Sequence, residues 1–241
     1  MKASLFITCI ADLMFADVGE SVVQVLRRNG VDLDFPAEQT CCGQPAFSSG
    51  YYKEAATVAK KVIQAFEKSE RVVMPSGSCA AMIHHGYPTL FADDPEWKHR
   101  AESFVAKTYE FSQFLVDVLG ITDVGATFKK KVTYHSSCHM TRMLGVEEQP
   151  KILLKNVKGL DFIELPNAFD CCGFGGTFAI KMSEISEAIL EEKVEHIIGT
   201  GAEVLAGSDL TCLMNIGGRL SRLGHPIKVL HVAQILNQGV R

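Results

Sequence analysis

The sequence predicts an α/β protein made of two tandem-duplicated halves, each a mostly parallel sheet with flanking helices and cysteines at the strand carboxyl ends. Two observations lead to this fold class. Short apolar segments alternate with longer amphipathic ones, which is typical of parallel sheets covered by helices. In addition, the eight cysteines form two sets of four, and corresponding members lie 129 to 133 residues apart.

The duplication also predicts where each half begins and ends. We expect a first half over residues 1–120, a seam over 121–131 and a second half over 132–241. The strands expected in the first half cover 5–9, 31–36 and 71–74, and those in the second cover 132–138, 160–166 and 203–206. The expected helices cover 51–69 and 179–198. Each half closes on a related segment, 107–115 in the first and 228–236 in the second.

The cysteines follow the expected strands in the same order in both halves. The first set is Cys9, Cys41, Cys42 and Cys79, and the second set is Cys138, Cys171, Cys172 and Cys212. Because the carboxyl ends of parallel strands meet at one edge of a sheet, each set is expected to converge on one site. Thiolates suit zinc, copper(I) and iron–sulfur clusters. Four of them satisfy either a tetrahedral zinc ion or a cubane cluster.

Each Cys-Cys pair is followed by a glycine, Gly43 or Gly173. Glycine allows a close backbone approach or a positive φ angle. In the second half the run continues through Gly175 and Gly176, whose amides are candidate donors to cluster sulfides or to an anion at the next helix start. We therefore expect these four glycines to contribute to cofactor binding. Adjacent cysteines favour a bulky cluster, since structural zinc sites usually use a C-x-x-C knuckle.

Other roles for the cysteines stay open. Two structural zinc sites, a disulfide such as Cys41 with Cys79, and inert buried thiols are the alternatives, although inert thiols would not reproduce the spacing. No apolar run reaches the roughly 20 residues of a membrane span, and Asp12 interrupts the apolar start, so a cytoplasmic location is expected. In that compartment thiols stay reduced, which favours metal binding. A net charge of -4 gives no support for nucleic-acid binding.

Three histidines are candidate catalytic residues, because imidazole titrates in the range that a proton donor or acceptor needs. His135 and His139 lie on either side of Cys138, and His231 lies in the closing segment, where the first half has Glu110. A structural role is the commoner one for a single histidine.

The spacing C-x31-CCG-x35-C followed by C-x32-CCG-x38-C resembles the CCG (cysteine-rich) domain family of iron–sulfur oxidoreductases. The stretches CCGQPA at 41–46 and CCGFGGTF at 171–178 resemble its lactate-utilization branch, and the resemblance spans nearly the whole chain. It implies an oxidoreductase subunit that transfers electrons through [4Fe-4S] clusters while L-lactate is oxidised to pyruvate. It further implies two partners, a companion ferredoxin-type iron–sulfur protein and a third lactate-utilization protein, and a small carboxylate or thiol as substrate.

The chain departs from the fuller family motif, which ends in C-x-x-C and has five cysteines per site. Ser76 and Asp209 occupy the position of the missing cysteine. Asp209 is a candidate oxygen ligand, because a carboxylate is ionised at neutral pH. A helix N-cap is the other role expected of it.

Two further functions remain as alternatives to electron transfer. One is a non-redox module with two structural zinc sites, and the other is a cluster-based thiol–disulfide reductase subunit of the heterodisulfide type. The sequence has no ferredoxin run and no flavin or nicotinamide motif, so it fits a subunit better than a complete enzyme.

Overall fold

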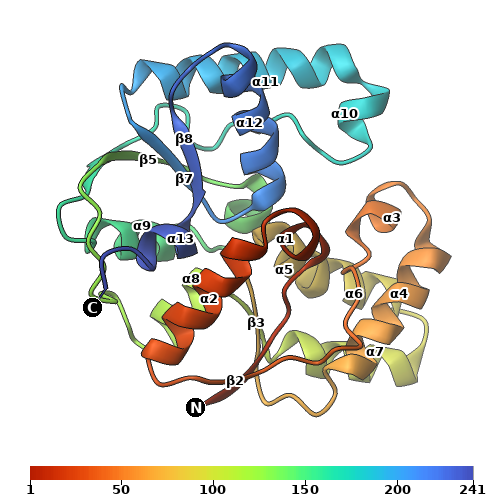
Figure 1. The fold of residues 1–241 in the computed structure, drawn as a ribbon. Coiled ribbons are helices and arrows are strands. Elements are labelled where there is room, and N and C mark those ends of the chain that lie inside the picture. Colours follow the sequence, from red (N-terminus) through yellow and green to blue (C-terminus); the bar gives the residue numbers. More distant parts are fainter. Residues whose placement is uncertain (241) are drawn as a thin grey trace.

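The computed structural model describes residues 1–240 and contains the same four-stranded sheet twice (Figure 1). The first sheet has the order β2-β1-β3-β4, with β1 at Lys2–Leu5, β2 at Asp32–Asp34, β3 at Val72–Met74 and β4 at Thr108–Glu110. The second has the order β6-β5-β7-β8, with β5 at Lys131–His135, β6 at Asp161–Ile163, β7 at Val204–Gly207 and β8 at Lys228–His231. All strand pairs are parallel. The predicted fold class is confirmed.

Helices connect the strands in both halves. Those of the first half are α1 (Cys9–Met14), α2 (Ala16–Arg28), α3 (Gln44–Ser48), α4 (Tyr52–Ala65), α5 (Gly77–Ala81), the π-helical turn η1 (Met82–Gly86), α6 (Tyr87–Leu90), α7 (Pro95–Val105), α8 (Phe111–Gln113) and η2 (Phe114–Val118). Those of the second half are η3 (His139–Met143), α9 (Glu148–Lys155), α10 (Phe178–Lys181), α11 (Ser183–Gly199), α12 (Leu210–Arg222) and α13 (Val232–Leu236). None of these helices, which cover everything helical in residues 1–240, is long and apolar enough to cross a membrane.

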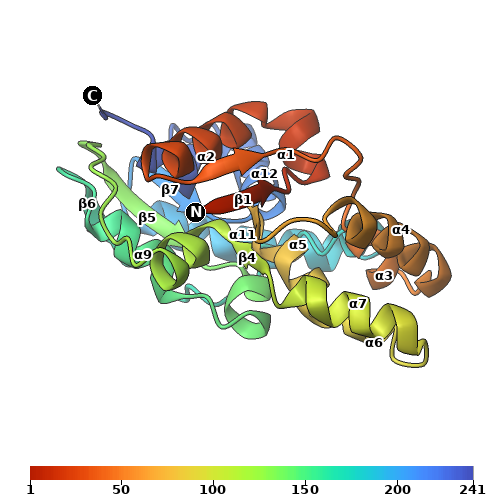
Figure 2. The same ribbon diagram turned by 90° about the horizontal axis from the view of Figure 1, so that it is seen from below.

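The two halves share a central apolar core. The buried face of α2 contributes Val22, Val25 and Leu26, and α13 of the second half contributes Val232 and Ile235 to the same cluster. Helices α2 and α13 lie side by side between the sheets (Figures 1 and 2). Separate outer cores cover the far faces, under α4 and α7 in the first half and under α11 and α12 in the second. Burial of apolar surface from both halves therefore fixes the position of one half against the other.

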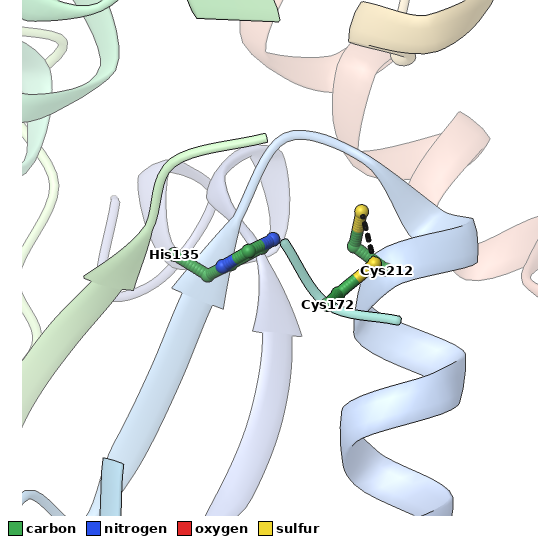
Figure 3. Close-up of side chains that lie close together, drawn as sticks. All are labelled: His135, Cys172 and Cys212. Carbon is green, nitrogen blue, oxygen red and sulfur yellow. Dashed lines mark hydrogen bonds between the residues drawn. The ribbon is translucent and has the colours of Figure 1, made fainter. Parts of the chain in front are cut away.

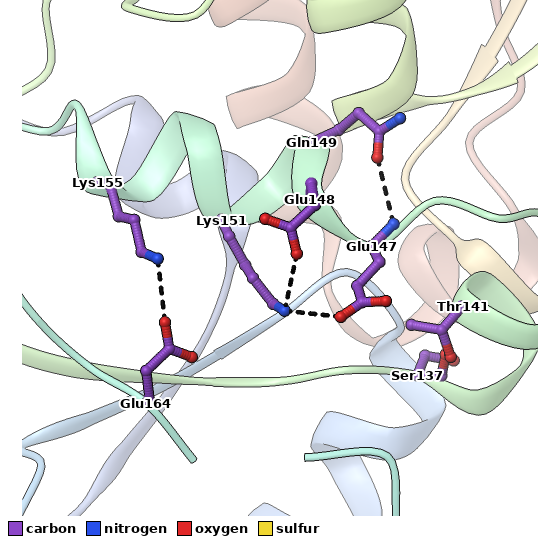
Figure 4. A network of polar contacts seen from close by, with 8 residues as sticks. All are labelled: Ser137, Thr141, Glu147, Glu148, Gln149, Lys151, Lys155 and Glu164. Carbon is purple, nitrogen blue, oxygen red and sulfur yellow. Dashed lines mark hydrogen bonds and ion pairs between the residues drawn. The ribbon is translucent and has the colours of Figure 1, made fainter.

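Polar contacts at the surface add little to this arrangement. Figure 4 shows Lys151 of α9 between Glu147 and Glu148, at 2.9 and 3.1 Å, and Lys155 bound to Glu164 at 3.0 Å. Exposed ion pairs of this kind contribute about 0–1 kcal/mol each. The fully buried Leu154 belongs to the central core and does more to position α9.

The structure corrects the ends of several predicted elements. The strands expected over 5–9 and 132–138 end earlier, at Leu5 and His135, so that Cys9 begins α1 and Cys138 precedes η3. The backbone turns out of the strand direction at Thr8, whose φ angle is 70°. The helix expected over 179–198 is two helices, α10 and α11, separated at Met182. The early ends of β1 and β5 lie directly before Cys9 and Cys138.

Candidate metal centres

Each set of four cysteines gathers at the carboxyl edge of its sheet. Cys9 starts the helix after β1, the Cys41-Cys42 pair lies in the loop after β2, and Cys79 lies in α5 after β3. The second half repeats this placement. Cys138 lies in the loop before η3, the Cys171-Cys172 pair in the loop after β6, and Cys212 in helix α12. The cysteines thus stand on loops and helix starts a few residues beyond the strands.

In the first site the sulfurs lie within contact of one another. The Sγ atoms of Cys9 and Cys41 are 3.7 Å apart, and the thiol of Cys42 donates to Cys79 Sγ at 3.4 Å. Leu210 and Thr211 of the second half line the same small pocket as these cysteines. The first site is therefore closed partly by the other half of the chain.

The second site repeats the contact between its two buried cysteines and adds a histidine neighbour. Cys172 donates to Cys212 Sγ at 3.1 Å, and Cys138 Sγ lies 3.6 Å from Nδ1 of His139. A ring nitrogen of His135 and the sulfurs of Cys172 and Cys212 all lie within 4.8 Å of one another, and all three residues are buried (Figure 3). Within residues 1–240 it is the one such group of three His, Cys, Asp or Glu residues whose ligand atoms all lie this close together.

Hydrogen bonding divides the thiols of each site. The pKa of Cys41 is lowered by the neighbouring thiols of Cys42 and Cys9, of which Cys9 donates to its sulfur, and by the backbone N–H of Gly43, which donates at 3.5 Å. The pKa of Cys171 is lowered in the same way by the thiols of Cys138 and Cys172 and by the N–H of Gly173. The pKa is raised for the donating thiols, by these bonds and by burial: Cys9, Cys42, Cys138 and Cys172. Ionising all four sulfurs of a site therefore requires a cation among them.

Pairs of sulfurs have the spacing of ligands around one metal ion, although within residues 1–240 no three sulfurs of either site lie within 4.8 Å of one another. A zinc ion about 2.3 Å from four thiolates places the sulfurs about 3.8 Å apart. The three Sγ–Sγ contacts of 3.1 to 3.7 Å are close to or below that spacing. A cubane cluster has the same four-thiolate requirement but is larger, so its binding would move the sulfurs apart.

Ser76 and Asp209, which replace the fifth cysteines, both cap a helix. The Ser76 side chain accepts from Cys79 N at the start of α5, and Asp209 Oδ1 accepts from Thr211 N at the start of α12. Asp209 Oδ2 also accepts from Ser78 N of the other half at 2.7 Å. The helix-cap role of Asp209 is confirmed. Its bonds to Thr211 N and Ser78 N together engage both carboxylate oxygens. Metal binding by Asp209 stays a prediction.

Two of the four predicted cofactor-binding glycines donate to sulfur. Gly43 N and Gly173 N bond to the sulfur of the first cysteine of their pair, and both residues have positive φ angles, 87° and 79°. A Cβ at Gly173 would lie 2.5 Å from Ser186 O, so space as well as conformation requires glycine there. Gly175 and Gly176 also have positive φ angles and accept hydrogen bonds at the start of α10. Their contact with a cofactor stays a prediction.

The three predicted catalytic histidines have different surroundings. His139 is half-buried, and its Nε2 lies 3.2 Å from Nε2 of Gln44 in the other half. His231 is buried at the end of β8, where Nδ1 accepts from Ala233 N and caps α13, as Glu110 caps α8. His135 is buried beside the cysteines, and burial lowers its pKa to about 4. A catalytic role of any of them stays a prediction.

The sequence analysis did not identify the residues that hold the Cys-Cys loops. Tyr87 donates to Cys42 O at 3.1 Å, and Asn215 donates to Cys172 O at 2.8 Å. Lys193, fully buried in α11, donates to Asn167 O at 2.7 Å just before the second loop. The sequence pattern could have revealed Lys193, because this charged residue falls on the apolar face of its helix with Leu190, Val194 and Ile197.

A duplicated parallel α/β scaffold that gathers four thiols at each sheet edge defines a cysteine-rich protein with two candidate metal centres. The profile of the cysteine-rich domain family, CCG, matches residues 3–84 and 132–217. The chain belongs to this family. The two matched segments carry all eight cysteines, one set in each.

Among curated relatives the chain is similar to proteins that share a single name. It is 57% identical over 98% of its length to "Lactate utilization protein A" of Oceanobacillus iheyensis, covering 97% of that protein. It is also 57% identical to "Lactate utilization protein A 1" of Bacillus mycoides, over 99% of this chain and 97% of that protein. It is 55% identical to "Lactate utilization protein A" of an Exiguobacterium species, over 100% of this chain and 98% of that protein. The solved glutamate racemase of Campylobacter jejuni aligns over 98% of this chain and 83% of its own, with 14% identity and a TM-score of 0.34, which is too low to establish a shared fold.

Proposed function

We propose that this protein is the iron–sulfur subunit of a cytoplasmic system that oxidises L-lactate to pyruvate, and that its cysteines hold clusters that carry the electrons. The observation that carries the proposal is the presence of two complete four-thiol sites in a chain 57% identical to proteins named for lactate utilization. All eight cysteines are free thiols in the described structure. A disulfide framework is therefore not part of the proposal.

The protein's own residues would prepare and enclose the clusters. Bound clusters, [4Fe-4S] in this proposal, supply reversible one-electron transfer. Gly43 N and Gly173 N already donate to sulfur, and such bonds stabilise negative charge on a thiolate ligand. Cys42, Cys79, Cys172 and Cys212 are buried, whereas the other four are partly exposed. Each site thus has a closed side toward the core and an open side toward a partner.

The proposed reaction requires companions. Oxidation of lactate to pyruvate releases two electrons and two protons, so electrons must enter and leave this chain. We propose a ferredoxin-type iron–sulfur protein and a third lactate-utilization protein as these companions. His139, half-buried beside Cys138, is the best-placed candidate to accept a proton near the open side of the second site. A small carboxylate such as lactate, or a thiol, is the substrate class that this proposal allows at the sites.

The sulfur spacing supports a second candidate, a structural module with one zinc ion per site. The Sγ–Sγ contacts of 3.1 to 3.7 Å have the spacing of two ligands of one zinc ion, and the remaining sulfurs of each site would move inward to complete a tetrahedral set. In that case the cysteines would stabilise the fold, and chelation would unfold the protein.

Metal analysis separates the two candidates. The protein is purified without oxygen, its iron, sulfide and zinc are measured, and EPR spectra are recorded before and after dithionite. About four to eight irons with equal sulfide, and a signal that changes on reduction, support electron transfer. Two zinc ions and no EPR signal would instead establish the structural module. Reduction of the iron centres by L-lactate only when the companion proteins are added would then test the lactate assignment.

A further inference from the structure

The two sites differ at the position three residues before their first cysteine. The first half has Phe6 there and the second has His135, and both side chains are fully buried at the end of the first strand of their sheet. Phe6 belongs to the apolar cluster that contains Cys42 and Cys79. The same place in the second site therefore holds an imidazole next to Cys172 and Cys212.

His135 has no hydrogen-bond partner in the described part of the chain. Both Nδ1 and Nε2 are buried and unpaired, and the side chain is 1% exposed. An unpaired polar group in the interior is destabilising, because it gives up its hydrogen bonds to water without replacement. A histidine retained for packing alone would carry that cost at two atoms, whereas Phe6 fills the equivalent place without it. Its nitrogens therefore need a partner that the protein atoms do not supply.

The missing partner lies on the side of the cysteines. Figure 3 shows the ring of His135 extending from the end of β5 toward Cys172 and Cys212. A ring nitrogen and the two sulfurs lie within 4.8 Å of one another, a separation that one metal centre can bridge. Imidazole and thiolate together are common ligands of zinc and of iron–sulfur centres.

We propose that His135 binds the metal of the second site through a ring nitrogen, together with the thiols of Cys172 and Cys212 and in place of one of the four thiols, whereas the first site has thiols alone. The inference rests on the proposed metal-binding function. A nitrogen lone pair forms the bond to the metal, and no bond breaks if the ring is neutral. Since histidine ligands raise the potential of Fe–S centres relative to all-thiolate ones, the second centre should be the stronger electron acceptor of the two.

The test compares wild-type protein with His135→Phe, which installs the residue of the first site, and with His99→Phe at an exposed position as the control. Iron–sulfur protein is prepared without oxygen, and pulsed EPR records nitrogen hyperfine couplings of each paramagnetic centre. We expect a histidine coupling in wild type that shifts when the histidines are labelled with ¹⁵N. His135→Phe should lose that coupling and lower the reduction potential of one centre only, whereas His99→Phe should change neither.

Labelling of the wild type keeps the test valid if His135→Phe does not fold. Iron-loaded wild type without a label-sensitive coupling overturns the inference and leaves electron transfer intact. Full coupling in a folded His135→Phe protein also overturns it. If the protein contains zinc instead, X-ray absorption at the zinc edge should find a nitrogen ligand in wild type and only sulfur in His135→Phe. Sulfur alone in wild type would overturn the inference, while protein without any metal would refute the proposed function itself.

Discussion

The two halves keep the same backbone and thiols but differ in the residues that surround them. At three equivalent positions the first half has Leu5, Phe6 and Ser76, and the second half has Tyr134, His135 and Asp209. Tyr134 donates to Ser208 at 3.4 Å and Asp209 reaches across to the first half, so the second site is embedded in buried polar groups. The buried cysteines of both sites also pack in apolar clusters, those of the first site with Phe6 and those of the second with Leu190. The two halves thus place their cysteines on equivalent elements, while the residues at these three positions differ chemically.

The affinity and reduction potential of a bound metal depend on the residues around its ligands as well as on the number of ligands. Buried polar groups and charges are costly unless they are paired, and they alter the affinity and potential of a neighbouring metal. Two sites with equal thiols are therefore expected to differ in metal affinity and in redox behaviour. The following predictions test how independent and how different the sites are.

The largest effect is expected from removing one thiol in each half in turn. Cys172→Ala should abolish metal binding at the second site and spare the first, and Cys42→Ala should do the reverse. Each variant should therefore lose about half of the bound metal, because a four-thiolate site does not tolerate loss of a buried ligand. Metal analysis and EPR of oxygen-free protein check this. Unchanged metal content in Cys172→Ala would show that the ligand assignment is wrong.

The glycines after the Cys-Cys pairs should respond unequally to substitution. Gly43→Ala forces a left-handed conformation on alanine and should cost about 1–2 kcal/mol of unfolding free energy. Gly173→Ala adds a Cβ 2.5 Å from Ser186 O, and overpacking of this kind costs about a further 1–3 kcal/mol. Urea unfolding of protein with matched metal content measures both. Equal losses would mean that the loop after Gly173 relaxes freely.

The helix caps should also differ, because only one of them joins the halves. Ser76→Ala removes a local cap and should cost about 1 kcal/mol. Asp209→Ala removes a cap and also leaves the buried Ser78 N–H without its acceptor, for a total of about 2–4 kcal/mol. Asp209→Asn keeps one of the two acceptor oxygens, because its amide nitrogen only donates, and should lose an intermediate amount. If Asp209 were instead a metal ligand, metal content would fall in both Asp209 variants while Ser76→Ala kept its metal.

The last prediction concerns pH, at the equivalent caps Glu110 and His231, whose effects build up gradually over several pH units. Burial raises the pKa of Glu110 from 4.5 to about 8 and lowers the pKa of His231 from 6.5 to about 4. Folded protein therefore keeps a proton on Glu110 that unfolded protein releases above pH 4.5, so this contribution to stability is lost as pH rises toward 8. For His231 the unfolded state binds the extra proton, and its contribution is lost as pH falls from 6.5 toward 4.

Each of these groups can change the free energy of unfolding by at most about 1.4 kcal/mol per pH unit. Glu110→Gln should flatten the decline between pH 6.5 and 8. Below pH 6.5 the two groups act in opposite directions, so His231→Gln should gain stability relative to wild type as pH falls. Urea unfolding is measured at a series of pH values. The difference between each variant and wild type separates the contribution of Glu110 or His231 from the pH dependence caused by the thiols. A Glu110→Gln profile parallel to wild type above pH 6.5 would contradict the raised pKa.

The sequence by itself determined the duplication, the parallel α/β class and the grouping of the cysteines. These features depend on local periodicity and on one general property of parallel sheets, that their carboxyl ends meet at one edge. It also identified the equivalence of Glu110 and His231, because both lie at the same strand-to-helix junction. Periodicity did not locate the early ends of β1 and β5, since the apolar run continues past the point where the backbone leaves the sheet.

Only the tertiary structure decided which residues of one half reach into the other. Asp209 bonds to Ser78, Gln44 lies against His139, and α2 shares a core with α13. Each of these pairs joins the two halves across at least 95 residues of sequence. The approach of His135 to Cys172 and Cys212 depends on the path of a loop and a helix far along the chain. Such contacts follow from the packing of complete elements, and no local pattern encodes them.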